Sequence, residues 1–266
     1  MMDKTGSRFH VPRGKFQVPS STFQVLSQQL FITWNPEPGT AQPNPEPGTR
    51  NPEPRTPSGA YRLNLDGPMT AHALVLRLVG QNRSVLEIGP ASGYLSRCFV
   101  DAGCRVTGIE ADPEAASRAD HPDIQLIYGS VEEEKVLRQV RGTFDVIVLA
   151  DVLEHLRWPE QTLARVRSFL NPGGYAVVSL PNIANWKTRI GLLLGRFEYR
   201  EEGILDRTHL RFFTKRSAVA MILEAGYEVL EFHPGATRMP VILLKAWPTL
   251  CAVHLVFKIA PREGGS

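Results

Sequence analysis

The chain has 266 residues, 42% of them hydrophobic, and a formal net charge of +3 at pH 7. This length accommodates one folded domain of ordinary size together with a tail, and the small net charge argues against a nucleic-acid partner. The three cysteines lack C-x-x-C spacing, which favours neither a disulfide framework nor a zinc site. We therefore predict a cytoplasmic protein and assign no metal.

The first 59 residues differ from the rest of the chain. Three copies of a unit of the form N-P-E-P-G/R-T begin at Asn35, Asn44 and Asn51. Proline at every second position excludes both a helix and a β-ladder. We predict a disordered, proline-rich tail over residues 1–59 and a folded domain over residues 60–266. Whether the repeats are a linker, a recognition tract or translated upstream DNA stays open.

A helix over residues 70–79 is predicted to lead into a strand–turn–helix–strand unit at 84–110. In this unit an apolar run ends at Gly89, a helical pattern follows, and residues 105–109 are β-rich again. The turn at 89–93 has small residues where a backbone must bend sharply and let a ligand approach the positive end of a helix. The sequence therefore predicts a ligand site at this turn.

Two carboxylates flank the predicted site, Glu87 within the first strand and Glu110 at the end of the second. An acidic residue about 20 positions after such a turn typically accepts hydrogen bonds from a ribose. The dinucleotide pattern G-x-G-x-x-G is not met, because Ala91 and Tyr94 replace its second and third glycines. These features favour a nucleoside ligand and make a nicotinamide oxidoreductase a distant alternative.

At these positions the sequence resembles the class I S-adenosylmethionine-dependent methyltransferases. Glu87, Gly89 and Gly93 match their motif E/D-x-G-x-G-x-G, and Ala91 occupies the position of its middle glycine. The resemblance implies an α/β fold: a Rossmann-like, doubly wound sheet of seven strands in the order 3-2-1-4-5-7-6, with the last strand antiparallel. It also implies S-adenosylmethionine as cofactor, bound by Glu87, Gly89, Ala91, Gly93, Glu110, Ser130, Val131 and Asp151.

The next elements support this reading. Asp112 and the proline after it predict a helix start, with the helix running to about residue 118, and residues 124–128 form a third strand. In the resembled family the turn that follows usually carries an aspartate that contacts the adenine amine. Ser130 takes that place here, and it either accepts this hydrogen bond or caps a helix predicted over residues 131–140.

The fourth strand, residues 144–149, is almost wholly apolar, as is typical of a central parallel strand. It ends in the run D-V-L-E-H-L, which resembles the motif after the corresponding strand of many small-molecule methyltransferases. Ligands of open α/β sheets bind at the carboxyl ends of strands, so Asp151 and His155 are expected near the reacting centre. His155 is interpreted as a residue that shapes the cofactor site or orders a loop, with catalytic base as the alternative.

The fifth strand is expected at residues 175–180, after a helix at 158–170, and is followed by a segment that we call the insertion, residues 182–213. The insertion is longer than a plain connection requires, which predicts a substrate cap. A hydroxyl acceptor would need a base, for which His209 and Asp206 are the first candidates and His155 the next. Alternatively, Asp206 and Arg207 form a salt bridge that merely pins the loop.

The C-terminal part is predicted to form a helix at 215–225, a strand at 227–232, a short helix and a last strand at 253–259. Residues 241–260 are mostly apolar, but two lysines within them would cost about 5 kcal/mol or more at the centre of a membrane-spanning helix. We therefore predict no transmembrane span, and leave contact with a membrane surface open.

The resemblance covers approximately residues 61–260. Within it, the sequence of the insertion resembles that of bacterial methyltransferases found with cell-surface glycan genes and with methionine biosynthesis. The resemblance implies methyl transfer from S-adenosylmethionine to a small-molecule or glycan-linked acceptor. The alternative is a non-catalytic domain that binds the cofactor and regulates a biosynthetic enzyme. The methylated atom and the oligomeric state are not indicated by the sequence.

Overall fold

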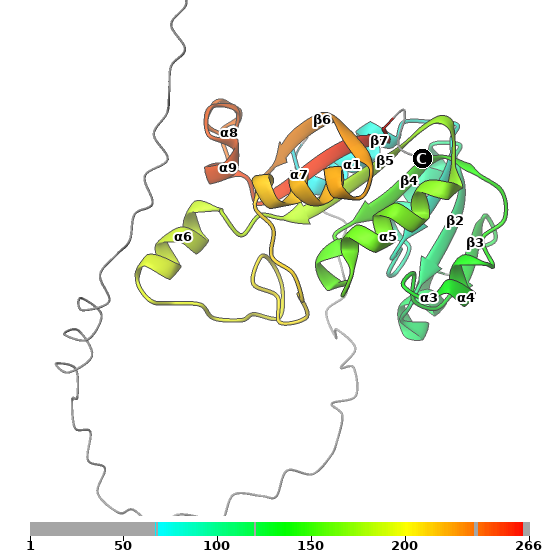
Figure 1. Cartoon of the computed structure of the whole chain (residues 1–266), viewed down its shortest axis with the longest axis horizontal. Coiled ribbons are helices and arrows are strands. Elements are labelled where there is room, and N and C mark those ends of the chain that lie inside the picture. The colour runs from blue at the N-terminus through cyan, green and yellow to red at the C-terminus, as the bar shows by residue number, and fades with distance from the viewer. Residues whose placement is uncertain (1–66, 68, 120, 237–238, 263–266) are drawn as a thin grey trace, which may run out of the picture. The chain divides into compact units, whose positions relative to one another are not determined.

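A seven-stranded sheet is the centre of the computed structural model, which describes residues 67, 69–119, 121–236 and 239–262 (Figure 1). The strand order is β3-β2-β1-β4-β5-β7-β6, and β7 runs antiparallel to both of its neighbours. The predicted order and the antiparallel last strand are thus confirmed. The strands are β1 (Ser84–Ile88), β2 (Arg105–Glu110), β3 (Ile124–Tyr128), β4 (Phe144–Ala150), β5 (Leu170–Pro181), β6 (Tyr227–Gly235) and β7 (His254–Pro261).

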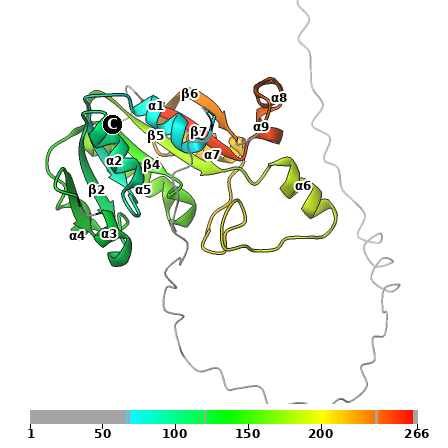
Figure 2. The ribbon, with the colours of Figure 1, turned by 180° about the vertical axis from the view of Figure 1, so that it is seen from behind.

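Helices cover both faces of the sheet (Figures 1 and 2). They are α1 (Ala71–Val79), α2 (Tyr94–Asp101), α3 (Pro113–Ala119), α4 (Glu134–Leu137), α5 (Pro159–Val166), α6 (Trp186–Leu193), α7 (Lys215–Glu224), α8 (Val241–Ala246) and α9 (Pro248–Cys251), with short 3-10 turns at η1 (Leu153–His155) and η2 (Arg167–Phe169). Alternate residues of β4 enter two hydrophobic clusters, Val146 and Val148 on the side of α1 and α2, Ile147 and Leu149 on the side of α5 and α7. A strand buried on both faces explains the continuous apolar run read from the sequence.

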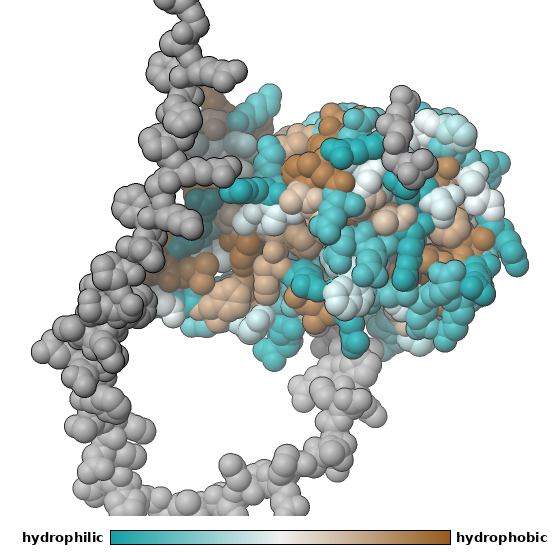
Figure 3. Space-filling view, viewed as in Figure 1, coloured by the Kyte–Doolittle hydropathy of each residue, from teal (hydrophilic) through white to brown (hydrophobic). Residues whose placement is uncertain are grey.

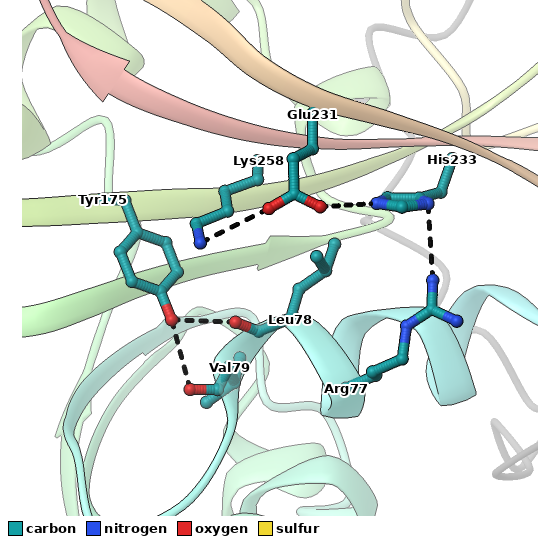
Figure 4. A network of polar contacts seen from close by, with 7 residues as sticks. All are labelled: Arg77, Leu78, Val79, Tyr175, Glu231, His233 and Lys258. Carbon is teal, nitrogen blue, oxygen red and sulfur yellow. Dashed lines mark hydrogen bonds and ion pairs between the residues drawn. The ribbon is translucent and has the colours of Figure 1, made fainter.

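Helix α1 is fastened to the sheet by polar contacts at its C-terminal end. The Tyr175 hydroxyl on β5 donates to the carbonyl oxygen of Leu78 at 2.8 Å and lies 3.2 Å from that of Val79. A second chain of contacts links the helix to β6 and β7 through Arg77, His233, Glu231 and Lys258 (Figure 4). These contacts fix the direction of α1 and hence the position of its first turn at the opposite end.

The predicted helix over residues 131–140 is too long, because within this range only α4, residues 134–137, is helical. The Glu132 carboxylate accepts hydrogen bonds from the backbone N–H groups of Arg157 and Trp158, at 3.1 and 3.0 Å. These contacts hold the preceding turn outside the helix. Strand β5 begins at Leu170 rather than at residue 175, because Leu170 already pairs with Phe144 before a register shift.

The insertion is anchored at its first residues. The Asn182 side-chain amide donates to the carbonyl oxygens of Thr249 and Ala252 at 3.0 and 2.9 Å, and the Asn185 amide also reaches that of Ala252, at 2.9 Å. Both asparagines are buried. The insertion therefore starts from a fixed point beside α9 before it continues as α6, over which apolar side chains gather at the surface (Figure 3).

The predicted tail, residues 1–59, lies outside the described residues. Within the part of the chain that the structure describes, no helix is long and apolar enough to cross a membrane.

Replacing Asn182 with Ala should destabilise the protein by about 2 kcal/mol, because the carbonyl oxygen of Thr249 and the backbone N–H of Ala184 lose their partner and the carbonyl oxygen of Ala252 keeps only Asn185. Urea unfolding of the two proteins measures the difference. Gln161→Ala, at an exposed position of α5, is the control and should change the free energy of unfolding by no more than about 0.5 kcal/mol. Equal effects of the two substitutions would show that the asparagine does not anchor the insertion.

Candidate active site

A cavity of about 510 Å³ lies where β1, β2, β3 and β4 end, a size typical of small-ligand sites. It brings together the predicted ligand residues Glu87, Gly89, Ala91, Glu110, Ser130, Val131 and Asp151. The other lining residues include His72, Ile109, His155, Leu156 and Thr208. The sheet order explains this convergence, since the carboxyl ends of parallel strands meet at one edge.

The turn after β1 needs its two glycines for different reasons. A Cβ on Gly89, whose φ is +68°, would lie 2.8 Å from a methyl carbon of Val152. A Cβ on Gly93, with φ +74°, would lie 3.0 Å from the Cα of Ala119. Gly93 is not among the lining residues of the cavity, and its lack of a side chain lets the start of α2 pack closely against α3.

Glu110 connects two turns of the cavity wall. One carboxylate oxygen accepts a hydrogen bond from the backbone N–H of Ala91 and the other from that of Asp112, both at 2.8 Å. Ala91 has a φ of +50°, a conformation that costs an alanine about 1–2 kcal/mol. The hydrogen bond to Glu110 offsets part of this cost. A carboxylate has about four acceptor sites, so Glu110 retains capacity for a ligand.

Glu87 is a buried acid in the same wall, with 2% of its surface exposed. Burial raises its pKa to about 7; the hydroxyl of Ser96, which donates to the carboxylate at 2.5 Å, opposes the rise, and the charge of Glu110 adds to it. Near neutral pH the side chain is thus close to half protonated. A cationic ligand group beside it would favour the ionised form.

Ser130 lines the cavity as expected, but it does not cap a helix. Its hydroxyl accepts a hydrogen bond from the backbone N–H of Glu132 at 3.2 Å and so shapes the turn before α4.

The opposite end of the cavity is built around Asp151. This residue has a φ of +53°, and its carboxylate accepts a hydrogen bond from the Ser179 hydroxyl at 2.8 Å. Its other oxygen lies 3.7 Å from Nε2 of His254 on β7. His72, in the first turn of α1, also lines this end; burial lowers its pKa and the charge of Asp151 opposes that effect. The sequence analysis missed both histidines, because no local motif marks them.

His155 follows Asp151 on the turn η1 and faces the cavity. Its Nδ1 lies 3.4 Å from the carbonyl oxygen and 3.2 Å from the hydroxyl oxygen of Thr208. That hydroxyl donates its hydrogen to Asp206 at 2.7 Å, so both neighbours of Nδ1 are acceptors. The contacts assign the ring hydrogen to Nδ1 and leave a lone pair on Nε2. Asp206 thereby orients Thr208, and its role as a base stays a prediction.

His209 lies next to His155, and the two rings meet edge to face with centroids 4.8 Å apart. Its Nδ1 is 3.2 Å from the carbonyl oxygen of Ile204, which again assigns the ring hydrogen to Nδ1. His209 is not among the lining residues of the cavity. The salt bridge considered between Asp206 and Arg207 does not form, because Arg207 pairs with Glu201 at 2.9 Å.

Glu154, between Asp151 and His155 in sequence, was not singled out by the sequence analysis. Only 1% of its surface is exposed, and neither carboxylate oxygen has a hydrogen-bond partner among the described residues. Burial, with the charges of Asp151 and Asp206 adding to it, raises its pKa well above the usual range. One oxygen of Glu154 and one nitrogen each of His155 and His209 lie within 4.8 Å of one another. This cluster can accept a proton or hold a cation.

Comparison with known proteins identifies the family. Residues 63–232 match a family model described as a methyltransferase domain. The chain belongs to this methyltransferase family. Ubiquinone biosynthesis O-methyltransferase of Burkholderia pseudomallei (strain 1710b) is 28% identical over 167 residues, which cover 59% of this chain and 71% of that protein. The protein of the same name from Burkholderia orbicola (strain MC0-3) is 28% identical over 181 residues, covering 66% and 75%.

Solved structures show the same fold. The CcbJ methyltransferase of Streptomyces caelestis superposes with a TM-score of 0.52 at 17% identity, covering 73% of this chain and 90% of that one. The N-methyltransferase NodS of Bradyrhizobium japonicum WM9 gives 0.51 at 20% identity, covering 72% and 94%. This methyltransferase therefore has the Rossmann-like fold that these structures share.

The cavity of this methyltransferase fits the cofactor. Glu110 would hold the ribose hydroxyls, Glu87 would face the cationic amino group, and the apolar side chains of Ile109, Val131 and Leu156 offer a slot for the adenine. When bound, the cofactor supplies a methyl group on a sulfonium. The Asp151 end of the cavity would then be left for an acceptor.

Glu110→Ala should weaken the binding of S-adenosylhomocysteine by about 2 to 3 kcal/mol, because paired hydrogen bonds to the ribose are lost. The melting temperature should fall as well, since Glu110 also holds two backbone N–H groups. Calorimetry measures the affinity. Glu114→Ala, which removes an exposed carboxylate on α3, is the control and should leave both quantities unchanged. Unchanged affinity in Glu110→Ala would contradict this placement of the ribose.

Binding of S-adenosylhomocysteine should release protons from the methyltransferase. At pH 7 about half of the Glu87 side chains are protonated, and the ligand's ammonium group favours the carboxylate, so about 0.5 proton should leave. The release should approach one proton near pH 6 and vanish above about pH 8. Calorimetry in buffers of different ionisation enthalpy measures it. Glu87→Gln should abolish it; persistence in that variant would mean that another group titrates.

Proposed function

We propose that the protein transfers the methyl group to a hydroxyl oxygen of a small-molecule or glycan-linked acceptor. The observation that carries this proposal is the cluster of Glu154, His155 and His209 beside the Asp151 end of the cavity. A hydroxyl must lose its proton as its oxygen attacks, and the lone pairs of this cluster suit that demand. His155, which lines the cavity, is the member that an acceptor would meet first.

A row of aromatic rings extends from this cluster into the insertion. The centroid of His209 lies 6.2 Å from that of Phe212, which lies 5.8 Å from Phe197, and Phe197 lies 5.5 Å from Tyr199. Phe197 and Tyr199 are exposed. Aromatic faces pack against flat apolar surfaces, so the row favours an acceptor with a planar or apolar face, such as a phenol or a sugar ring. This supports the role of the insertion, residues 182–213, as a substrate cap of the domain at 60–266.

Two resemblances bear on the acceptor. Relatives at 28% identity are named ubiquinone biosynthesis O-methyltransferase, which supports oxygen as the methylated atom. The insertion resembles that of methyltransferases encoded with cell-surface glycan or methionine biosynthesis genes, which supports a glycan-linked hydroxyl. Both acceptors present the same group to the cluster, and the chemistry of transfer is the same.

Mass spectrometry with isotopically labelled cofactor tests the proposal. The purified protein is incubated with matched acceptors: a catechol and its dimethyl ether, a sugar with free hydroxyls and its permethylated form, and an arylamine. We expect the label on the catechol or the sugar and on none of the blocked compounds. Labelling of the arylamine instead would contradict a hydroxyl acceptor. Binding of S-adenosylhomocysteine without transfer to any acceptor or to cell extract would favour the regulatory alternative.

A further inference from the structure

We propose that Glu154, His155 and His209 bind a divalent transition-metal ion of the Zn²⁺ class at the acceptor end of the cavity. The sequence analysis assigned no metal, so this inference departs from it. Its second part, that the ion activates the acceptor hydroxyl, rests on the proposed function. Its first part, that the ion binds, does not.

The three side chains are already gathered. One potential ligand atom from each residue lies within 4.8 Å of the other two. Around a tetrahedral Zn²⁺, with bonds of about 2.1 Å, neighbouring ligand atoms are about 3.4 Å apart. Binding of the ion would require the three side chains to rotate and close this difference. No other group of three such side chains in the described part of the chain is placed to do so.

The second shell of contacts matches that of a metal site. Histidines that bind a metal usually donate the other ring N–H to a carboxylate or a backbone carbonyl. In both histidines here Nδ1 faces a backbone carbonyl, that of Thr208 for His155 and that of Ile204 for His209. Each ring is thereby oriented with its Nε2 lone pair available. The two carbonyls belong to one short stretch of the insertion, so that stretch orients both ligands.

Glu154 supplies the charge that such a site needs. Its backbone carbonyl accepts hydrogen bonds from the N–H groups of Leu210 and Arg211, at 2.8 and 3.0 Å, which fixes the residue between η1 and the insertion. Its carboxyl group is held in the interior without a hydrogen-bond partner among the described residues. A buried carboxylate is costly unless it is paired or coordinates a metal. A divalent ion would provide the missing partner.

The donor set indicates the class of ion. Two imidazole nitrogens and one carboxylate oxygen suit Zn²⁺, Fe²⁺ or Co²⁺, whereas Mg²⁺ and Ca²⁺ prefer oxygen ligands alone. Three protein ligands leave a coordination position open, as in catalytic zinc sites. Because His155 and Thr208 line the cavity, the open position would face the acceptor.

An acceptor hydroxyl at that position would lose its proton more easily, since a metal ion lowers the pKa of a bound O–H group by several units. In the transfer the O–H bond breaks and its proton passes to solvent. A bond forms between the oxygen and the methyl carbon, and the carbon–sulfur bond of the cofactor breaks with its electron pair left on sulfur. The histidines then act as ligands rather than as bases.

The test is metal binding by the untagged full-length protein after treatment with EDTA. Titration calorimetry with Zn²⁺ should show one ion per chain with micromolar or tighter affinity. His209→Ala and Glu154→Gln should each weaken binding by about 100-fold or more. His121→Ala is the matched control, because His121 lies outside the cluster and its Nδ1 contacts only Asp123, 3.3 Å from the backbone nitrogen and 3.8 Å from the carboxylate. Affinity equal in His209→Ala and His121→Ala would overturn the proposal.

A measurement on the wild-type protein covers the case in which the variants fail to fold. Co²⁺ bound by imidazole and carboxylate shows ligand-field absorption without the sulfur-to-metal charge transfer that cysteine ligands produce. We expect the former spectrum. A thiolate spectrum, or no stoichiometric binding of either ion, would overturn the proposal.

The inference and the proposed function can fail separately. Undiminished methylation of a hydroxyl acceptor by the EDTA-treated enzyme would remove the activating role of the ion and leave the hydroxyl acceptor in place. Stoichiometric Zn²⁺ binding that His209→Ala abolishes, combined with methyl transfer to an amine alone, would keep the metal site and refute the hydroxyl acceptor.

Discussion

The Glu110 carboxylate holds the cofactor cavity together. By accepting a hydrogen bond from the turn after β1 and another from the turn after β2, it fixes two backbone segments that would otherwise be joined only through their strands. It also supports Ala91 in a left-handed conformation that an alanine avoids. The same carboxylate faces the cavity. One side chain therefore both shapes the wall and presents an acceptor to the ligand, so that little rearrangement is needed on binding.

Two further acids lie in the interior of the site without a cation beside them. Glu87 and Glu154 are almost fully buried, and burial raises the pKa of each. Such groups cost stability in the protein alone and are characteristic of functional sites, where a ligand supplies the missing charge. Glu87 stands at the cofactor end and Glu154 at the acceptor end. In our account a positive group lies beside each acid, the ammonium group of the cofactor beside Glu87 and a metal ion beside Glu154.

The parts of the fold that local chemistry determines were predictable from the sequence. The apolar runs of β1 and β4, the small residues of the turn at 89–93 and the spacing of Glu110 predicted the sheet and the position of the cavity at its edge. The acceptor end was only partly predictable. His72 and His254 come from elements far apart in the chain, and only the position of β7 beside β5 brings His254 to Asp151.

Other departures have the same origin in contacts between distant segments. Glu132 is drawn away from α4 by backbone groups before α5, which shortens the predicted helix. Asp206 accepts hydrogen bonds from Thr208 and so supports His155, a contact that the residue types alone do not reveal. Glu154 was overlooked because a glutamate is usually exposed to solvent. Its burial depends on the insertion, whose Leu210 and Arg211 donate to the Glu154 backbone carbonyl.

A crystal structure of the protein with S-adenosylhomocysteine tests the central claim most directly. The account predicts the ribose hydroxyls at hydrogen-bonding distance, about 2.6–3.2 Å, from the Glu110 carboxylate, with the amino group facing Glu87 and the sulfur directed toward Asp151 and His155. A ligand bound elsewhere, or one that places its adenine at the Asp151 end, would contradict it.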